Sequence, residues 1–297
     1  MNKFNQKIRI GKKLISEKSP AFIIGEIGSN HNLSLKTAKR LIDIAAAAGV
    51  DAVKFQSLKF DEQYLESETP GFLKKLHAKI DLAENLFVEL AAYSEKKGLV
   101  FLSAPTYLLS LAILEKINMA AYKIASPITF GFTSLIAAAA KMKKPLILSA
   151  GYCSLKEIDR AVKAVLASGN RQLILLHCVA NYPTLAKDAS LGFMKNLKER
   201  YGCLVGYSDH TMSTVIPAVA VALGARVIEK HFTYSRRAEG PDHSFALEPK
   251  ELTEMVKNIR QAEQALGFSH KISPFEKKMK KLVMMKLVAA KDIPAEA

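Results

Sequence analysis

Two histidines lie where apolar runs end, and their positions favour a shared metal ion. His210 closes the run LVGYSDH (204–210), and His231 lies in RVIEKHFT (226–233). Neighbouring strands of a sheet run about 4.8 Å apart. Imidazoles that face the same way from adjacent strands can therefore bind one divalent cation, with oxygen ligands or water completing its shell. The alternative for each histidine is an ordinary hydrogen-bonded residue at a strand end.

Charged residues also stand inside apolar runs, where an unpaired charge is costly to bury. Lys54 lies within DAVKFQ and Lys123 within AYKIAS. Two lysines that converge with serine hydroxyls at one end of a sheet would bind an anion such as a phosphate or a carboxylate. The alternative is that these lysines form internal ion pairs with Glu26 and Glu229.

Strand alternation predicts which of these side chains share a side. Residues i and i+2 of a strand point the same way, so Ser208 should lie beside His210, and Glu229 beside His231. A metal, an anion site and carboxylates gathered in one place suggest carbon–carbon bond chemistry on a small phosphorylated substrate.

The elements that must position these residues are short apolar runs alternating with amphipathic segments. Continuous apolar strands separated by helices are typical of a parallel sheet covered on its faces. Eight such units in 297 residues predict a (β/α)8, or TIM, barrel, with the active site at the C-terminal ends of the strands. The predicted strands are 21–28, 51–56, 99–105, 121–126, 145–151, 172–180, 204–210 and 226–233.

Two of the helices carry recognisable ends. The segment 35–49 should be a helix that ends at the glycine at position 49, and 154–169 should be one that begins at the serine at position 154.

The rest of the chain lies outside the barrel. Residues 7–16 alternate around a glycine and predict a hairpin within an N-terminal segment 1–20. The barrel is expected over 21–268. Residues 269–297 are interpreted as a linker and the start of a further, truncated domain.

Composition excludes several classes of protein. The 43 Lys and Arg against 28 Asp and Glu leave a net charge of +15, but no aromatic–basic interleaving indicates a nucleic-acid-binding module. No run of roughly 18 apolar residues predicts a membrane span, and the N-terminus has no apolar signal core. Three cysteines without metal-type spacing favour a reduced, cytoplasmic protein.

Several longer stretches resemble the sialic acid synthase family, which comprises N-acetylneuraminate, legionaminate and pseudaminate synthases and the related spore-coat polysaccharide proteins. They occur in order over roughly residues 20–265, and together they are far more specific than a single glycine motif. The stretches are IGEIGSNHN, AGVDAVKFQ, YKIAS, LILSAG, HCVANYPT, GYSDHT, IEKHFT and GPDHSFALEP.

The resemblance implies condensation of phosphoenolpyruvate with an N-acylated aldose, either N-acetylmannosamine or a 2,4-diacetamido-trideoxyhexose, to a nine-carbon 2-keto acid and phosphate. It implies a divalent metal on His210 and His231, usually Mn²⁺, with Mg²⁺ or Co²⁺ as alternatives, which would polarise the sugar aldehyde. It also implies a homodimer.

The resemblance further implies a role for each matching site residue. The residues implied as catalytic are Glu26, Lys54, Lys123 and Glu229. The residues implied as substrate-binding are Ser149, Asn181, Tyr182, Ser208 and Asp242. Of these, Lys54, Lys123, Ser149 and Ser208 would hold phosphoenolpyruvate.

Two departures from the family pattern stand out. Val179-Ala180-Asn181 precedes Tyr182 where relatives specific for N-acetylmannosamine usually carry a Thr-Asn pair. The family also continues into an antifreeze-like domain that supplies an arginine to the partner subunit, whereas here LVAAKDIPAEA resembles only its start. Two alternatives therefore stay open: a related phosphoenolpyruvate-dependent sugar-phosphate synthase, and a truncated paralogue that binds ligand without turnover.

Overall fold

Eight parallel strands form a nearly closed barrel in the computed structural model, which describes residues 3–267 and 271–295. Their order is β5-β4-β3-β10-β9-β8-β7-β6, and β5 and β6 at its two ends also lie side by side. The predicted TIM barrel is confirmed. The strands are β3 (Phe22–Glu26), β4 (Ala52–Ser57), β5 (Val100–Pro105), β6 (Tyr122–Ile124), β7 (Leu146–Ser149), β8 (Leu173–Cys178), β9 (Leu204–Asp209) and β10 (Val227–His231).

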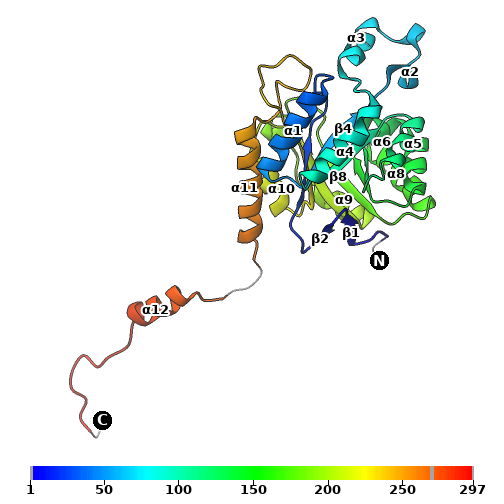
Figure 1. The fold of residues 1–297 in the computed structure, drawn as a ribbon. Helices are drawn as coiled ribbons and strands as arrows, with labels where there is room; N and C mark the ends of the chain where they lie inside the picture. The colour runs from blue at the N-terminus through cyan, green and yellow to red at the C-terminus, as the bar shows by residue number, and fades with distance from the viewer. Residues whose placement is uncertain (1–2, 268–270, 296–297) are drawn as a thin grey trace. The chain divides into compact units, whose positions relative to one another are not determined.

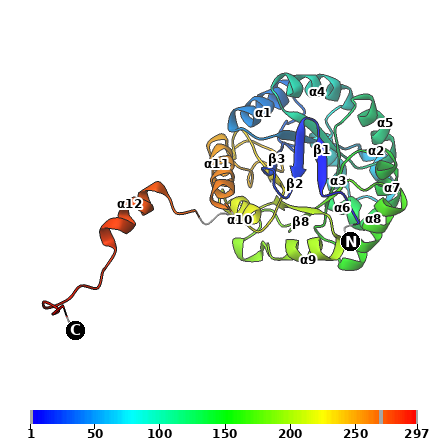
Figure 2. The same cartoon turned by 90° about the horizontal axis from the view of Figure 1, so that it is seen from below.

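Helices surround the barrel as a ring, which Figure 2 shows from below. Both predicted helix ends are confirmed: Ser154 caps α8 in a reciprocal capping box with Glu157, and Gly49 ends α1 with φ +80°. The helices are α1 (Leu35–Ala48), α4 (Phe87–Lys96), α5 (Leu108–Lys116), α6 (Ser126–Gly131), α7 (Thr133–Lys141), α8 (Leu155–Ala167), α9 (Phe193–Tyr201), α10 (Ile216–Ala222) and α11 (Pro249–Ala265).

The two ends of the barrel differ. The predicted hairpin, β1 (Lys7–Ile10) and β2 (Lys13–Ser16), lies across the end where the strands begin (Figures 1 and 2). Its side chains Ile8, Ile10 and Ile15 are buried in one cluster with the apolar residues of the barrel interior. The short helices α2 (Phe60–Gln63) and α3 (Gly71–Ile80) lie at the opposite end (Figure 1). That opposite end, where the strands finish, is called the mouth below.

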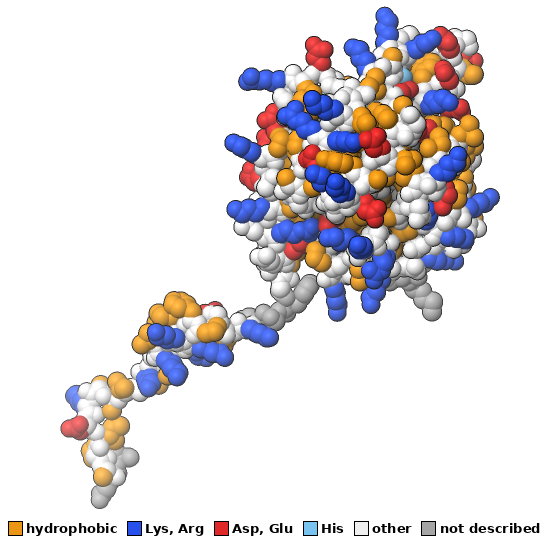
Figure 3. Space-filling model, in the orientation of Figure 1, with side chains coloured by type: hydrophobic (Ala, Val, Ile, Leu, Met, Phe, Trp, Pro, Cys, Tyr) orange, Lys and Arg blue, Asp and Glu red, His pale blue; other side chains and the backbone are white. Residues whose placement is uncertain are grey.

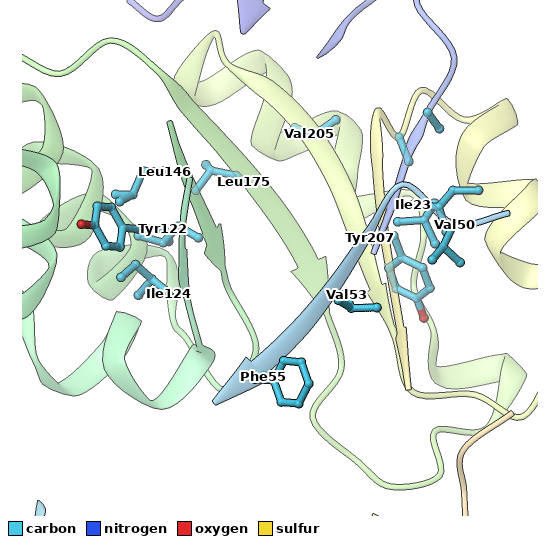
Figure 4. Close-up of a cluster of buried hydrophobic side chains, with 14 of the residues drawn as sticks. Ile23, Val50, Val53, Phe55, Tyr122, Ile124, Leu146, Leu175, Val205 and Tyr207 are labelled. Carbon is cyan, nitrogen blue, oxygen red and sulfur yellow. The ribbon is translucent and has the colours of Figure 1, made fainter. Parts of the chain in front are cut away.

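The strands contribute to two separate layers of core, and among the described strands only β6 lacks a residue in the inner one. The larger layer lies between the strands and the helices, and Figure 4 shows part of it, including Val53, Phe55, Tyr122 and Ile124. The smaller layer fills the lower part of the barrel interior. Since alternate residues face opposite sides, Lys54 and Lys123, each flanked by these outward-facing residues, point into the barrel.

Gly206 allows β9 and β10 to approach each other, so Gly206→Ala should destabilise the barrel. A Cβ at this position would lie 2.3 Å from the Val227 carbonyl oxygen and 2.6 Å from Leu176 Cδ2. Overpacking of this kind costs about 1–3 kcal/mol. Urea unfolding should show that loss. Gly192→Ala is the matched control because a Cβ there meets nothing within 4 Å; an equal loss in both variants would contradict the argument.

Residues after α11 form a second unit, Leu266–Ala297. Its described part contains α12 (Pro274–Val283), which begins at Ser273 in a capping box with Glu276 and has no buried side chain. The interpretation of 269–297 as a linker and the start of a further domain stays a prediction.

Two surface properties bear on the classes of protein considered above. Among the described residues, no helix combines the length and apolar character that crossing a bilayer would require. Lysine and arginine side chains are spread over the face seen in Figure 3 and mixed with acidic ones, so this face carries no concentrated basic patch.

Candidate active site

Four buried charged side chains form a connected network inside the barrel near its mouth. Lys54 Nζ lies 3.0 Å from Glu26 Oε2 and 3.6 Å from Glu229 Oε2. Lys123 Nζ lies 3.5 Å from Glu229 Oε1. Each residue is at most 6% exposed, and each charge faces an opposite one, as a buried charge requires. The internal ion pairs that the sequence allowed as an alternative are therefore present.

Polar side chains from neighbouring strands complete the network. Lys123 Nζ donates a hydrogen bond to Ser149 Oγ at 2.7 Å, and Ser208 Oγ donates to Glu229 Oε1 at 3.0 Å. Gln56 Nε2 donates to Glu26 Oε1 at 2.7 Å. The structure thus brings both predicted serines to the lysines and carboxylates.

The two carboxylates differ in acidity. Burial raises the pKa of Glu26 to about 7, against the opposing effect of Lys54. Burial also acts to raise the pKa of Glu229, but the neighbouring Lys123 and Lys54 outweigh it and bring the pKa to about 2. Near neutral pH, Glu26 can therefore hold a proton while Glu229 is ionised, a division typical of acid–base sites.

The two predicted metal-binding histidines face each other. They come from the adjacent strands β9 and β10, and their ring centroids lie 5.7 Å apart. His210 Nδ1 lies 2.7 Å from the Val179 carbonyl oxygen; because a carbonyl only accepts, Nδ1 carries the proton and Nε2 the lone pair. Burial lowers the pKa of both histidines, that of His231 to about 4. Both rings are therefore neutral at pH 7.

This donor set fits a divalent cation that has only two protein ligands. Among the described residues, no group of three or more His, Cys, Asp and Glu side chains is gathered as for a metal. Neutral imidazoles are suitable ligands, and the Val179 carbonyl orients His210 as an outer partner commonly does. His231 Nδ1 is buried without a hydrogen-bond partner in the described part of the chain. Substrate oxygens or water would supply the remaining ligands.

Aromatic rings line one side of the histidines. The Tyr182 ring centroid lies 4.2 Å from that of His210, and the Phe245 centroid lies 5.0 Å from that of Tyr182 and 5.3 Å from that of His231. Tyr182 is 45% exposed. Nothing in the sequence singles out Phe245, because an apolar residue in a loop gives no signal of its own. Asn181 is exposed, and no hydrogen bond of its side chain is observed in the described structure.

The loops after β3 and β10 are bound to each other. Asp242 Oδ2 accepts hydrogen bonds from Ser29 N and Ser29 Oγ, both at 2.9 Å. His243 is fully buried, with Nδ1 at 2.6 Å from Thr233 Oγ1 and Nε2 at 3.1 Å from Asn32 Oδ1. Residues 28–32 and 240–245 are called the loop clasp below. It holds Asp242 close to His231.

A second buried ion pair lies on the opposite face of β9 and β10, and Lys230→Met should break it. Lys230 Nζ lies 2.5 Å from Asp209 Oδ2, and Asp209 also accepts from Thr211 N. Removing the lysine leaves a buried carboxylate alone, at a cost of about 3–5 kcal/mol. Asp209→Asn/Lys230→Met should recover most of that loss in chemical denaturation. A double variant as unstable as the single one would contradict this account.

The chain is similar in sequence and in structure to proteins of one known family. Residues 41–271 match the NeuB family. An uncharacterized protein from Methanocaldococcus jannaschii is 43% identical over 90% of this chain and 78% of its own length. The N,N'-diacetyllegionaminic acid synthase of Campylobacter jejuni is 39% identical over 91% of this chain and 85% of its own. A crystal structure of N-acetylneuraminic acid synthetase from Leptospira borgpetersenii, in complex with citrate, aligns with a TM-score of 0.85 at 35% identity over 94% of this chain and 96% of that one.

Proposed function

Because the chain belongs to the NeuB, or sialic acid synthase, family, we propose that it condenses phosphoenolpyruvate with an N-acylated aldose. The products would be a nine-carbon 2-keto acid and inorganic phosphate. The observation that carries the proposal is the buried network of Lys54, Lys123, Glu26 and Glu229 beside two neutral histidines at the barrel mouth.

The lysines and serines support the phosphoenolpyruvate part of the proposal. With both lysines protonated, Glu229 ionised and Glu26 protonated, the network has one net positive charge, which favours an anion. Ser149 and Ser208 add hydroxyl donors to the same place. The Leptospira relative was crystallised with citrate, itself a multiply charged carboxylate.

The histidines support the metal part of the proposal. His210 and His231 would hold Mn²⁺ or a similar divalent cation, and such an ion supplies Lewis-acid polarisation of an aldehyde when bound. The chain's own contribution is to keep both rings neutral at pH 7 and to fix the tautomer of His210 through the Val179 carbonyl.

The two carboxylates would divide the proton and charge chemistry. The methylene carbon of phosphoenolpyruvate forms a bond to the aldehyde carbon, and the aldehyde oxygen becomes a hydroxyl by taking up a proton. Water then adds to the cationic carbon that bears the phosphate, and phosphate leaves. Glu26 can hold and transfer a proton at its carboxyl oxygen, while ionised Glu229 stabilises the positive charge that develops.

The acceptor would lie on the outer side of the histidines. Tyr182 and Phe245 offer ring faces, and Asp242 and Asn181 offer polar groups at the mouth. The relatives are named for different nine-carbon acids, legionaminic and neuraminic, so the proposal extends to N-acylated aldoses as a class.

Phosphate release tests the proposal directly. Purified protein with Mn²⁺ and phosphoenolpyruvate should release inorganic phosphate when one member of a panel of N-acylated hexoses is added. Release only with phosphorylated sugars would favour the sugar-phosphate synthase instead. Binding of phosphoenolpyruvate without release for any sugar would show a protein that binds ligand without turnover.

Glu26 should also make folding stability depend on pH. Its pKa of about 7 in the folded protein exceeds the ordinary value of 4.5, so the folded state binds the proton more tightly. The stabilisation from this proton is complete below pH 4.5 and is lost as pH rises through 7. Relative to Glu26→Gln, the wild type should therefore lose about 1–3 kcal/mol of unfolding free energy over that range. Urea unfolding of both proteins with EDTA measures this, and parallel pH profiles would contradict it.

A further inference from the structure

Asp242 and His231 both border the position that a side chain on Gly28 would occupy, referred to below as the space above Gly28. A Cβ built on Gly28 would lie 2.5 Å from Asp242 Oδ2 and 3.3 Å from His231 Nδ1. The φ of Gly28 is +54°, a conformation that side-chain-bearing residues rarely adopt. Only a glycine therefore lets the carboxylate and the imidazole nitrogen border the same space without strain.

His231 Nδ1 needs a partner that the surrounding protein does not otherwise provide. The residue is 9% exposed, and Nδ1 is a buried atom without a hydrogen bond among the described residues. Buried polar atoms without a partner are rare and call for an explanation. By contrast, the corresponding nitrogen of His210 is satisfied by the Val179 carbonyl. Of the pair, only His231 has an outer partner still to be assigned.

The position of Asp242 makes it suitable as the hydrogen-bond partner of His231 Nδ1. Ser29 N and Ser29 Oγ both donate to its Oδ2, whereas its Oδ1 accepts no hydrogen bond from the described residues. His243, the next residue, is locked between Thr233 and Asn32. The loop clasp thus fixes the backbone on both sides of the space, so the carboxylate is held at this position without depending on a bound sugar.

We propose that Asp242 is a positioning residue for His231, accepting a hydrogen bond from Nδ1–H directly or through one water. This bond selects the tautomer in which Nε2 carries the lone pair, as the Val179 carbonyl does for His210. The inference rests on the proposed function in one respect: the lone pair is there for the divalent cation. It differs from the role expected from the resemblance, in which Asp242 is a contact of the sugar.

Asp242→Ala tests the proposal without relying on turnover. In ¹⁵N-histidine-labelled, metal-free protein at pH 7, the His231 imidazole signals, assigned by their loss in His231→Gln, should show protonated Nδ1 in the wild type and a mixture of tautomers in the variant. The affinity for Mn²⁺, measured by electron paramagnetic resonance of the free ion, should fall about 10–100-fold, the usual effect of losing an outer partner.

Two further variants make the result decisive. Glu239→Gln removes an exposed carboxylate from the same loop, one that forms no hydrogen bond or ion pair among the described residues, and should change neither measurement. Gly28→Ala should act like Asp242→Ala, since its Cβ displaces the carboxylate, and it provides a second route if Asp242→Ala fails to fold. An unchanged tautomer and unchanged Mn²⁺ affinity with a raised KM for the sugar would overturn the proposal. The tautomer result holds even if no sugar is turned over.

Discussion

His210→Ala and His231→Ala should each lower turnover by about 10²–10³-fold, the scale seen when a single group that stabilises developing charge is removed. Neutral imidazoles from β9 and β10 are the proposed cation ligands, and two ligands leave no redundancy. Stability should change far less, because neither ring takes part in an ion pair with any residue that the structure describes. Steady-state phosphate release and Mn²⁺ affinity measure the first effect, and urea unfolding measures the second.

His177→Ala is the matched control for this prediction. It also removes a histidine from the end of a barrel strand, but the His177 ring packs against Phe193 of α9 and Tyr207, on the helical side. Its Nε2 bonds to the Ala189 carbonyl. We expect this variant to lose stability while keeping its Mn²⁺ affinity. Full turnover after loss of both His210 and His231 would refute the proposed metal site.

Lys54→Met should abolish phosphoenolpyruvate binding and also destabilise the fold. The lysine is the only cation paired with Glu26 among the described residues, and it also faces Glu229. Above pH 7, where Glu26 is ionised, losing Lys54 leaves Glu26 buried without a cation, at a cost of about 3–5 kcal/mol. Glu229 still faces Lys123. Titration calorimetry with phosphoenolpyruvate and urea unfolding measure the two losses.

A double variant separates the structural from the ligand-binding role of this lysine. Lys54→Met/Glu26→Gln removes both charges of the closer pair, so most of the stability should return. Affinity for phosphoenolpyruvate should not return, because the cation is still missing. If the double variant binds phosphoenolpyruvate as the wild type does, Lys54 has only a structural role and the anion site must lie elsewhere.

The framework of this protein could be predicted from the sequence because the signals are local. Each strand is a continuous apolar run, which is what a sheet buried on both faces requires, and all eight predicted strands are present. Alternation along β10 also indicated that Glu229 and His231 share a side. Both belong to the cluster at the mouth, whereas Lys230 between them faces Asp209 on the other side.

Contacts between loops could not be predicted in the same way. Phe245 follows no periodic pattern, and its place beside Tyr182 and His231 depends on how the loop after β10 folds back. Periodicity likewise gave no indication that Ser29 anchors Asp242, since these residues are far apart in the chain. Such partners are set by backbone conformation, here the positive φ of Gly28. A glycine allows a positive φ but does not require one, so the sequence alone does not predict it.

The isoleucine-lined hairpin covers the barrel at the end opposite the lysines, so a ligand of the lysines would have to approach them from the mouth. Access from one end only would impose an order on the binding of two ligands. If the proposed function holds, we expect the molecule that contacts the almost fully buried Lys54 and Lys123 to bind before the one that rests against half-exposed Tyr182. We expect release in the reverse order, so a product bound at the two lysines would leave after the product bound at Tyr182.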